Sequence, residues 1–273
     1  MSCTKEIVLE PEAAKPQISV DGAIYNNKDT QTVYLNRTQP IYTRDNPYMV
    51  TGASLSVSDD SGGSWLFTET APGTYTAAFR GKSLHTYTLT FTSGAYTYSA
   101  QAYLPRTVKP DSLMFDFKEK GMGQDPGFEA RLAGRDPRGS GENYRTKVWR
   151  NGSEYADTAQ KSNEIQILND YSINWDGLPF IPPMEFGINQ FKRFKKDDIV
   201  RLWLMTTDKS TYQFLDACNR EMNNGGLFAV PPGNVPTNIT GGGTDITTKA
   251  VGHFAAYAVS EVNVVVPNKV ILP

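Results

Sequence analysis

The sequence has few of the residues that carry most metal and nucleophile chemistry. Only two cysteines, Cys3 and Cys218, occur in 273 residues, which excludes a disulfide framework because such frameworks need several pairs. The two histidines, His85 and His253, lie far apart and do not form the ligand spacing of a common zinc site. Nucleophile-elbow, phosphate-loop and His-Glu-x-x-His motifs are absent. We therefore expect no catalytic residue, no metal and no cofactor.

The sequence also lacks a long apolar run and an excess of either charge. No segment approaches the roughly 18 consecutive apolar residues that span a bilayer as a helix. Lysine and arginine number 27 and aspartate and glutamate 29, which gives a formal net charge of −2. This balance argues against a protein that neutralises nucleic-acid phosphates. We expect no nucleic-acid partner.

Short segments in which apolar and polar residues alternate dominate the first part of the chain. Between Gln17 and Pro105 there are seven of them, separated by turns that contain glycine, proline or serine. In Tyr87–Phe91, for example, threonines separate three large apolar residues. Aromatic residues reach 11%, which is also typical of β structure. The pattern predicts a mainly β fold that begins with an Ig-like β-sandwich over residues 17–105.

The rest of the chain continues the β pattern with one exception. Two prolines in residues 105–110 predict a linker. Residues 111–273 are expected to form a larger antiparallel β-sandwich or barrel-like domain, in which Asn151-Gly152 marks a hairpin turn. The exception is Ser210–Asn223, where apolar residues recur at helical spacing. We predict one helix near residues 210–223, with three side chains packed inward: Leu215, Cys218 and Met222.

Carboxylate pairs and the second histidine have structural interpretations. Asp59-Asp60 lies in a serine- and glycine-rich turn, where aspartate commonly caps its own backbone. Asp197-Asp198 precedes a strand-like segment and is interpreted in the same way. His253 lies in an apolar run and is expected to be a core or strand residue.

Aromatic residues in two long, proline-bearing loops are the candidate binding residues. The loops are residues 38–51 and 175–186, and long loops on rigid sandwiches often carry binding sites. Rings there could stack on a sugar or fill a partner's pocket. The alternative is that Trp175 and Phe180 fold their loop onto the second sheet. The candidate ligand-binding residues are Tyr42, Tyr48, Trp175 and Phe180.

Groups of residues along the chain carry two resemblances. The first part is similar to the carboxypeptidase-regulatory-like, transthyretin-type sandwich, through Val20–Ile24, Val50–Val57, Asp60–Gly63 and Ala71–Tyr75. The chain as a whole resembles an uncharacterised family of Bacteroidetes lipoproteins, a domain of unknown function that is often encoded beside TonB-dependent transporters. The segments that carry this second resemblance are Asp125–Phe128, Glu142–Arg145, Trp175–Phe180, Asp197–Val200, Thr211–Phe214, Leu227–Pro232, Asn234–Gly242 and Val251–Tyr257.

The second resemblance implies a location and a partner. In such lipoproteins the mature chain starts at an acylated cysteine, which here is Cys3, and residues 1–16 then form a flexible tether. The alternative is a chance cysteine near the start of a cytosolic protein. The resemblance implies a lipid-anchored outer-membrane protein that faces the cell exterior and serves a TonB-dependent nutrient transporter. A surface protein that binds or degrades glycans is the alternative function.

Overall fold

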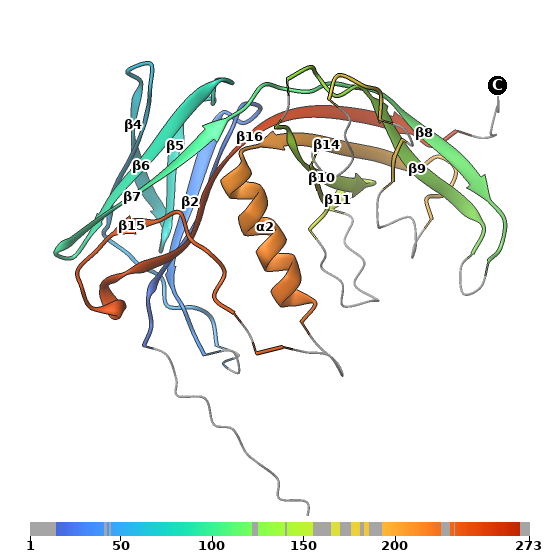
Figure 1. Ribbon diagram of the computed structural model, residues 1–273. Helices are drawn as coiled ribbons and strands as arrows, with labels where there is room; N and C mark the ends of the chain where they lie inside the picture. Colours follow the sequence, from blue (N-terminus) through green and yellow to red (C-terminus); the bar gives the residue numbers. More distant parts are fainter. Residues whose placement is uncertain are drawn as a thin grey trace, which may run out of the picture.

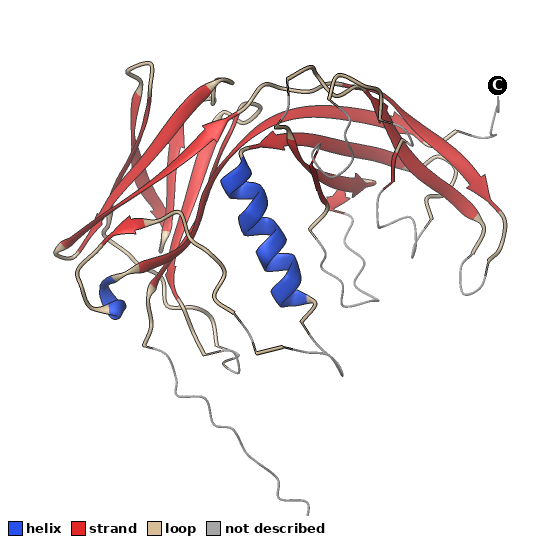
Figure 2. Ribbon diagram, viewed as in Figure 1, coloured by secondary structure: helices blue, strands red, loops and turns tan. Residues whose placement is uncertain are grey.

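The computed structural model describes residues 15–40, 43, 45–121, 125–139, 141–154, 165–169, 176–180, 183–185, 193–224, 230–231 and 233–267. Strands dominate these residues, and one long helix lies beside a large curved sheet (Figures 1 and 2). The predicted fold class, mainly β with one helix, is confirmed. The predicted tether, residues 1–16, lies almost wholly outside the described residues.

Seven strands form the first part of the chain, as the alternation predicts. Each has apolar side chains on one face, because successive residues of a strand point to opposite sides. In β6, Tyr87, Leu89 and Phe91 are at most 1% exposed, whereas the threonines between them point outward. The seven strands are β1 (Ile18–Tyr25), β2 (Thr30–Arg37), β3 (Ser54–Asp59), β4 (Ser64–Ala71), β5 (Thr74–Ala78), β6 (His85–Ser93) and β7 (Tyr96–Leu104).

The second part adds shorter strands and the helix. The predicted hairpin at Asn151-Gly152 is confirmed: both residues have positive φ and join β10 to β11 through a two-residue turn. The elements are β8 (Pro110–Lys118), β9 (Gly127–Gly134), β10 (Asn143–Arg150), β11 (Ser153–Glu154), β12 (Ile167–Asn169), β13 (Met184–Glu185), β14 (Ile199–Thr207), α2 (Lys209–Met222), β15 (Thr240–Gly241), the 3₁₀ turn η3 (Ile246–Thr248) and β16 (Ala250–Val265).

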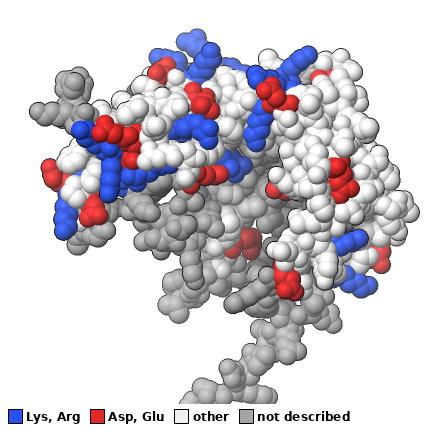
Figure 3. Space-filling model, turned by 180° about the vertical axis from the view of Figure 1, so that it is seen from behind, with Lys and Arg blue, Asp and Glu red and all other residues white. Residues whose placement is uncertain are grey.

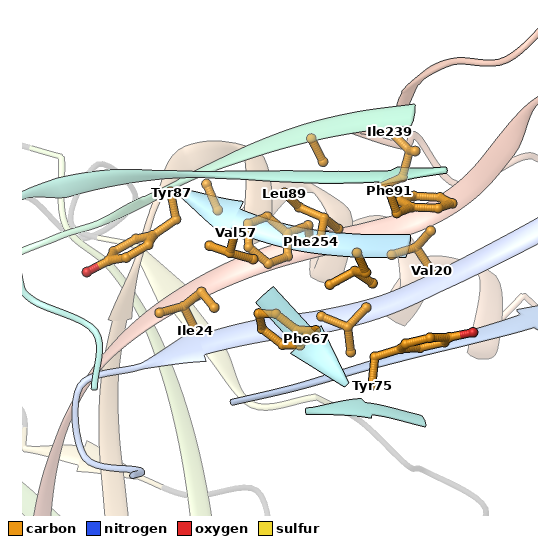
Figure 4. Close-up of a cluster of buried hydrophobic side chains, with 14 of the residues drawn as sticks. Val20, Ile24, Val57, Phe67, Tyr75, Tyr87, Leu89, Phe91, Ile239 and Phe254 are labelled. Atoms are coloured by element: carbon orange, nitrogen blue, oxygen red, sulfur yellow. The ribbon is translucent and has the colours of Figure 1, made fainter. Parts of the chain in front are cut away.

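A single large sheet connects the two parts of the chain. Its strand order is β11-β10-β14-β16-β1-β2-β5-β4-β3-β6-β7-β15, and β12 pairs with β10 off this path. The curled first part encloses one core, in which Phe254 of β16 lies among side chains of β1 and β6 (Figure 4). A separate sheet, β13-β9-β8, packs on one face of β10 and β14 and encloses a second core that includes Leu132, Leu202 and Leu204.

Strand β16 belongs to both parts. Its first half pairs with β1 in parallel, from Ala250 opposite Ile18 to Tyr257 opposite Tyr25, whereas the other described strand pairs are antiparallel. Its second half pairs with β14. Gly252 permits the close approach to β1, because it has φ +96° and a Cβ there would lie 2.1 Å from the Val20 carbonyl oxygen. Strand β16 therefore pairs with strands of both predicted units, 17–105 and 111–273. The division of the chain into these two domains stays a prediction.

The predicted linker, residues 105–110, forms hydrogen bonds and an ion pair with neighbouring segments. The Arg106 guanidinium pairs with Glu142 and donates to the carbonyls of residues 137–139. The Arg106 carbonyl accepts from Thr206 Oγ1 at 2.6 Å, and the Val108 carbonyl accepts from Ser260 Oγ at 2.6 Å. These contacts fasten residues 105–110 to β14 and β16.

Candidate functional site

The large sheet has a second face, opposite the two cores, on which α2 lies. Because successive residues of a strand point to opposite faces, the odd-numbered residues of β16 should lie on this face. The contacts between His253 and α2 confirm this. The His253 Nε2 atom lies 3.1 Å from Thr211 Oγ1, and its ring stacks on Phe214 at 4.6 Å between centroids. Burial lowers the pKa of His253 to about 4, so the imidazole is neutral near pH 7. This side of the sheet is called the helix face below.

Helix α2 covers only part of the helix face. Its N-cap, Asp208, accepts from the Thr211 backbone at 2.7 Å and from the Tyr103 backbone of β7 at 2.9 Å, which anchors the first turn. Leu215 is buried as predicted. The predicted inward position of Met222 is wrong, since its side chain is 51% exposed. Toward its C-terminus the helix runs away from β14 (Figure 1).

Aromatic rings from four strands form a row on the helix face. Trp149 of β10 and Trp203 of β14 have centroids 4.9 Å apart. Trp203 lies 6.2 Å from Tyr25 of β1, and Tyr25 stacks on Tyr257 of β16 at 5.4 Å. Cationic side chains lie over these rings. We call this set the aromatic–cation strip; its members are Tyr25, Lys28, Arg145, Trp149, Arg201, Trp203 and Tyr257.

The cations of the strip are held by rings. The Lys28 ammonium lies 3.8 Å from the Tyr25 ring centroid, and the Arg201 guanidinium carbon lies 4.3 Å from a Trp149 centroid. Arg145 lies over the Tyr257 ring and donates to its hydroxyl at 3.0 Å. Within the described ranges, none of these three cations has a carboxylate within ion-pair distance. The strip therefore carries positive charge that no described acidic side chain neutralises directly.

Other basic residues have acidic partners. At the end of the molecule formed by β8 and β9, basic and acidic side chains lie side by side (Figure 3). Arg131 pairs there with Asp116, and Arg193 pairs with Glu129 at 3.2 Å. Beside the strip, Lys147 pairs with Glu154 at 3.0 Å. Within the described ranges, the three strip cations are thus the only partly buried lysines and arginines without an ion pair.

Buried polar side chains fix the position of the strip. The Gln31 side chain is fully buried, and its amide nitrogen donates to the carbonyls of Tyr25 and Lys28 at 3.0 and 2.9 Å. Asn26 Oδ1 accepts from the Val259 backbone at 2.7 Å, which ties the β1–β2 turn to β16. Such contacts limit the rearrangement that binding would require.

The predicted ligand-binding residues and Cys3 differ in whether the structure describes them and in how exposed they are. Tyr42, Trp175 and Cys3 lie outside the described residues. Tyr48 is 74% exposed. Phe180 is 2% exposed and packs edge-on against Tyr144 at 5.8 Å, which agrees with the alternative in which the loop folds onto the second sheet.

Asp59 and Asp198, one member of each carboxylate pair, have the structural role that the sequence suggested. Asp59 Oδ1 accepts from the backbone amides of Ser61 and Gly63 at 3.0 and 2.7 Å. Asp198 accepts from the Lys195 backbone and from Asn151 Nδ2, so it fixes the turn before β14. His253 is buried, as predicted.

Sequence reasoning missed the strip, although a signal was present. In β10 and β14, rings and cations occupy alternate positions, and most of the residues between them are buried and apolar. Arg145, Lys147 and Trp149 follow this pattern in one strand, and Arg201 and Trp203 in the other. Alternation places each set on one face but does not reveal that the two strands are neighbours.

The fold and this face define a mainly β protein with rings and cations arranged on a rigid sheet. Residues 4–263 match the family described as Domain of unknown function (DUF4249), and the chain belongs to that family. A search of curated proteins found no match. Within the described ranges, no group of three or more His, Cys, Asp or Glu residues is placed to hold a metal ion. No helix in that part of the chain is long and apolar enough to cross a membrane.

Proposed function

We propose that this protein binds a ligand without transforming it, as a lipid-anchored outer-membrane protein that faces the cell exterior and serves a TonB-dependent nutrient transporter. The aromatic–cation strip is the observation that supports binding. It combines flat apolar surface with a few charged groups, which is the usual composition of a ligand site. The anchor on Cys3, the Bacteroidetes origin and the transporter come from the sequence resemblance to lipoproteins of that kind.

The acidic residues beside the strip favour binding over hydrolysis. Glycoside hydrolysis commonly uses two carboxylates, one of which gives a proton to the leaving group. Glu154 is paired with Lys147, and Glu261 accepts from Trp203 Nε1 at 2.7 Å. Both carboxylates therefore already have a partner within the protein. A glycan-binding protein remains the second candidate, because the aromatic row suits sugar rings; a glycan-degrading protein has less support here.

Fractionation and capture in the native host test the proposal. Full-length protein should fractionate with the outer membrane, and Cys3→Ala should not, because stable anchoring depends on acyl chains. After cross-linking in intact cells, the wild-type protein should recover a TonB-dependent transporter. Membrane fractionation of Cys3→Ala equal to that of the parent would exclude the proposed anchor. Cross-linking that repeatedly recovers no transporter would exclude the proposed partner, and glycan hydrolysis abolished by one Asp or Glu substitution would exclude a purely binding role.

A further inference from the structure

The three cations of the strip are short of hydrogen-bond acceptors. Arg145 Nε is buried and has no acceptor, while another nitrogen of this guanidinium donates to Tyr257. An ammonium has three donors and a guanidinium five. Among the described contacts, neither Lys28 nor Arg201 donates a hydrogen bond from its side chain, although each lies over a ring. The remaining donors suit an anion supplied from outside the chain.

Another positive charge lies close enough to affect Lys28. The pKa of Lys28 is lowered by burial and by the positive charge of Lys147. Elsewhere on the protein, buried or half-buried cations have carboxylate partners, as Arg106 has Glu142 and Arg150 has Asp198. Partly buried cations without a carboxylate are costly unless an anion compensates them. A bound anion would therefore be attracted to the strip.

The rings indicate that the ligand is more than a simple anion. Three partly exposed rings, Trp149, Trp203 and Tyr25, follow one another at centroid spacings of 4.9 and 6.2 Å, so the row is longer than one six-membered ring. The fourth ring, Tyr257, is buried and supports Tyr25 from the sheet side. Part of the sheet beyond the row is open, since Glu261 and Asn263 on the same face are exposed. An extended ligand with repeated flat faces would use such a row. Apolar faces of sugar rings stack on aromatic side chains.

We propose that the aromatic–cation strip binds an acidic oligosaccharide, whose rings pack on Trp149, Trp203 and Tyr25 and whose carboxylates accept hydrogen bonds from Lys28 and Arg201, while Arg145, whose Nε is buried, adds positive charge. This inference rests on the proposed binding function and specifies its ligand. Glu154 and Glu261 flank the cations and would repel a densely charged chain. One carboxylate per ring gives the sparse charge that this arrangement tolerates. A nucleic acid or an acidic peptide fits less well and is included in the test.

Calorimetry with defined oligomers tests the ligand class. The probes are a galacturonic acid tetramer, its methyl ester, a glutamate tetramer and a single-stranded DNA oligomer. The acid tetramer should bind, and esterification should weaken binding at least tenfold because the charges are removed. Raising the salt concentration should also weaken it. Equal affinity for the ester, tighter binding of the peptide or the DNA, or no binding of the acid tetramer would each overturn the proposal.

Matched variants locate the binding. Arg201→Gln and Lys28→Gln should each weaken binding of the acid tetramer about tenfold, and Trp149→Ala should weaken it by a similar factor. Arg80→Gln is the control, because Arg80 is exposed, has its own partner Asp29 and lies outside the strip. Thermal melts must first show that every variant is folded, and Trp149→Phe replaces Trp149→Ala where it is not. Binding that all strip variants retain would place the site elsewhere and contradict the proposal.

The two proposals have separate outcomes. If the acid tetramer does not bind but wild-type protein still recovers the transporter from cells, the saccharide proposal fails and the proposed function stands. If the tetramer binds through the strip but no transporter is recovered, the ligand assignment stands and the partner is wrong.

Discussion

The two parts of the large sheet use their outward faces differently. In the first part, the residues opposite the core are mainly small and neutral, such as Thr88, Thr90 and Thr92 of β6. In the second part, the corresponding positions of β10 and β14 hold tryptophan, arginine and lysine. Threonine suits a strand that is exposed to water, because its branched side chain fits the pleated backbone. Such a surface does not need rings and unpaired cations, so the comparison supports the proposed strip on β10 and β14, to which the first part adds Tyr25 and Lys28.

Variants in the shared strand β16 test whether the two parts of the chain unfold independently. Phe254→Ala should lower the free energy of unfolding by about 3–5 kcal/mol, because this fully buried ring fills the first core. Since β16 also pairs with β14, we expect both parts to unfold in one transition, measured in denaturant by circular dichroism and tryptophan fluorescence. Val265→Ala is the control, with an effect of about 0.5 kcal/mol or less at its 56% exposed position. Two separate transitions would show that the parts are independent.

Variants in α2 test whether only the first turns of this helix pack on the sheet. Leu215→Ala should cost about 2–4 kcal/mol of unfolding free energy, because the side chain is buried against the sheet. Met222→Ala, in the exposed last turn, should cost about 0.5 kcal/mol or less. Chemical denaturation of both variants provides the measurement. Similar losses at the two positions would mean that the helix packs along its whole length.

The smallest expected effect concerns the pH dependence of stability. The pKa of His253 is about 4 in the folded protein, against 6.5 for an unperturbed histidine. The unfolded state therefore binds more protons between these values, so stability falls as the pH is lowered through this window. From pH 7 to pH 5 we expect His253 to account for a loss of about 1–2 kcal/mol.

Two variants isolate this contribution from that of the carboxylates. Stability of His253→Gln should depend less on pH between 7 and 5, because the residue that takes up the proton on unfolding is gone. Val265→Ala should keep the parent's pH dependence, because this substitution at a 56% exposed position removes no titratable group. Chemical melts at both pH values measure the difference. A pH profile of His253→Gln that matches the parent would contradict the assigned role of burial.

The sequence predicted local structure better than the site. Alternation located the seven strands of the first part, and Asn151-Gly152 located a hairpin, because both signals act over a few residues. Helical spacing found α2 but placed Met222 inward, since periodicity does not show where a helix leaves its sheet. The strip depends on β1, β10, β14 and β16 being neighbours. That order is set by long-range pairing, which no short motif encodes.

The parallel pairing of β1 with β16 has a consequence for biosynthesis. Strand β1 leaves the ribosome well before its partner β16, because Ile18 pairs with Ala250. Until then one hydrogen-bonding edge of β1 stays open, and open edges of this kind are prone to pair with other chains. Contacts between such distant segments also slow folding. A premature stop codon before residue 250 would therefore remove a strand from the part of the protein that was translated first.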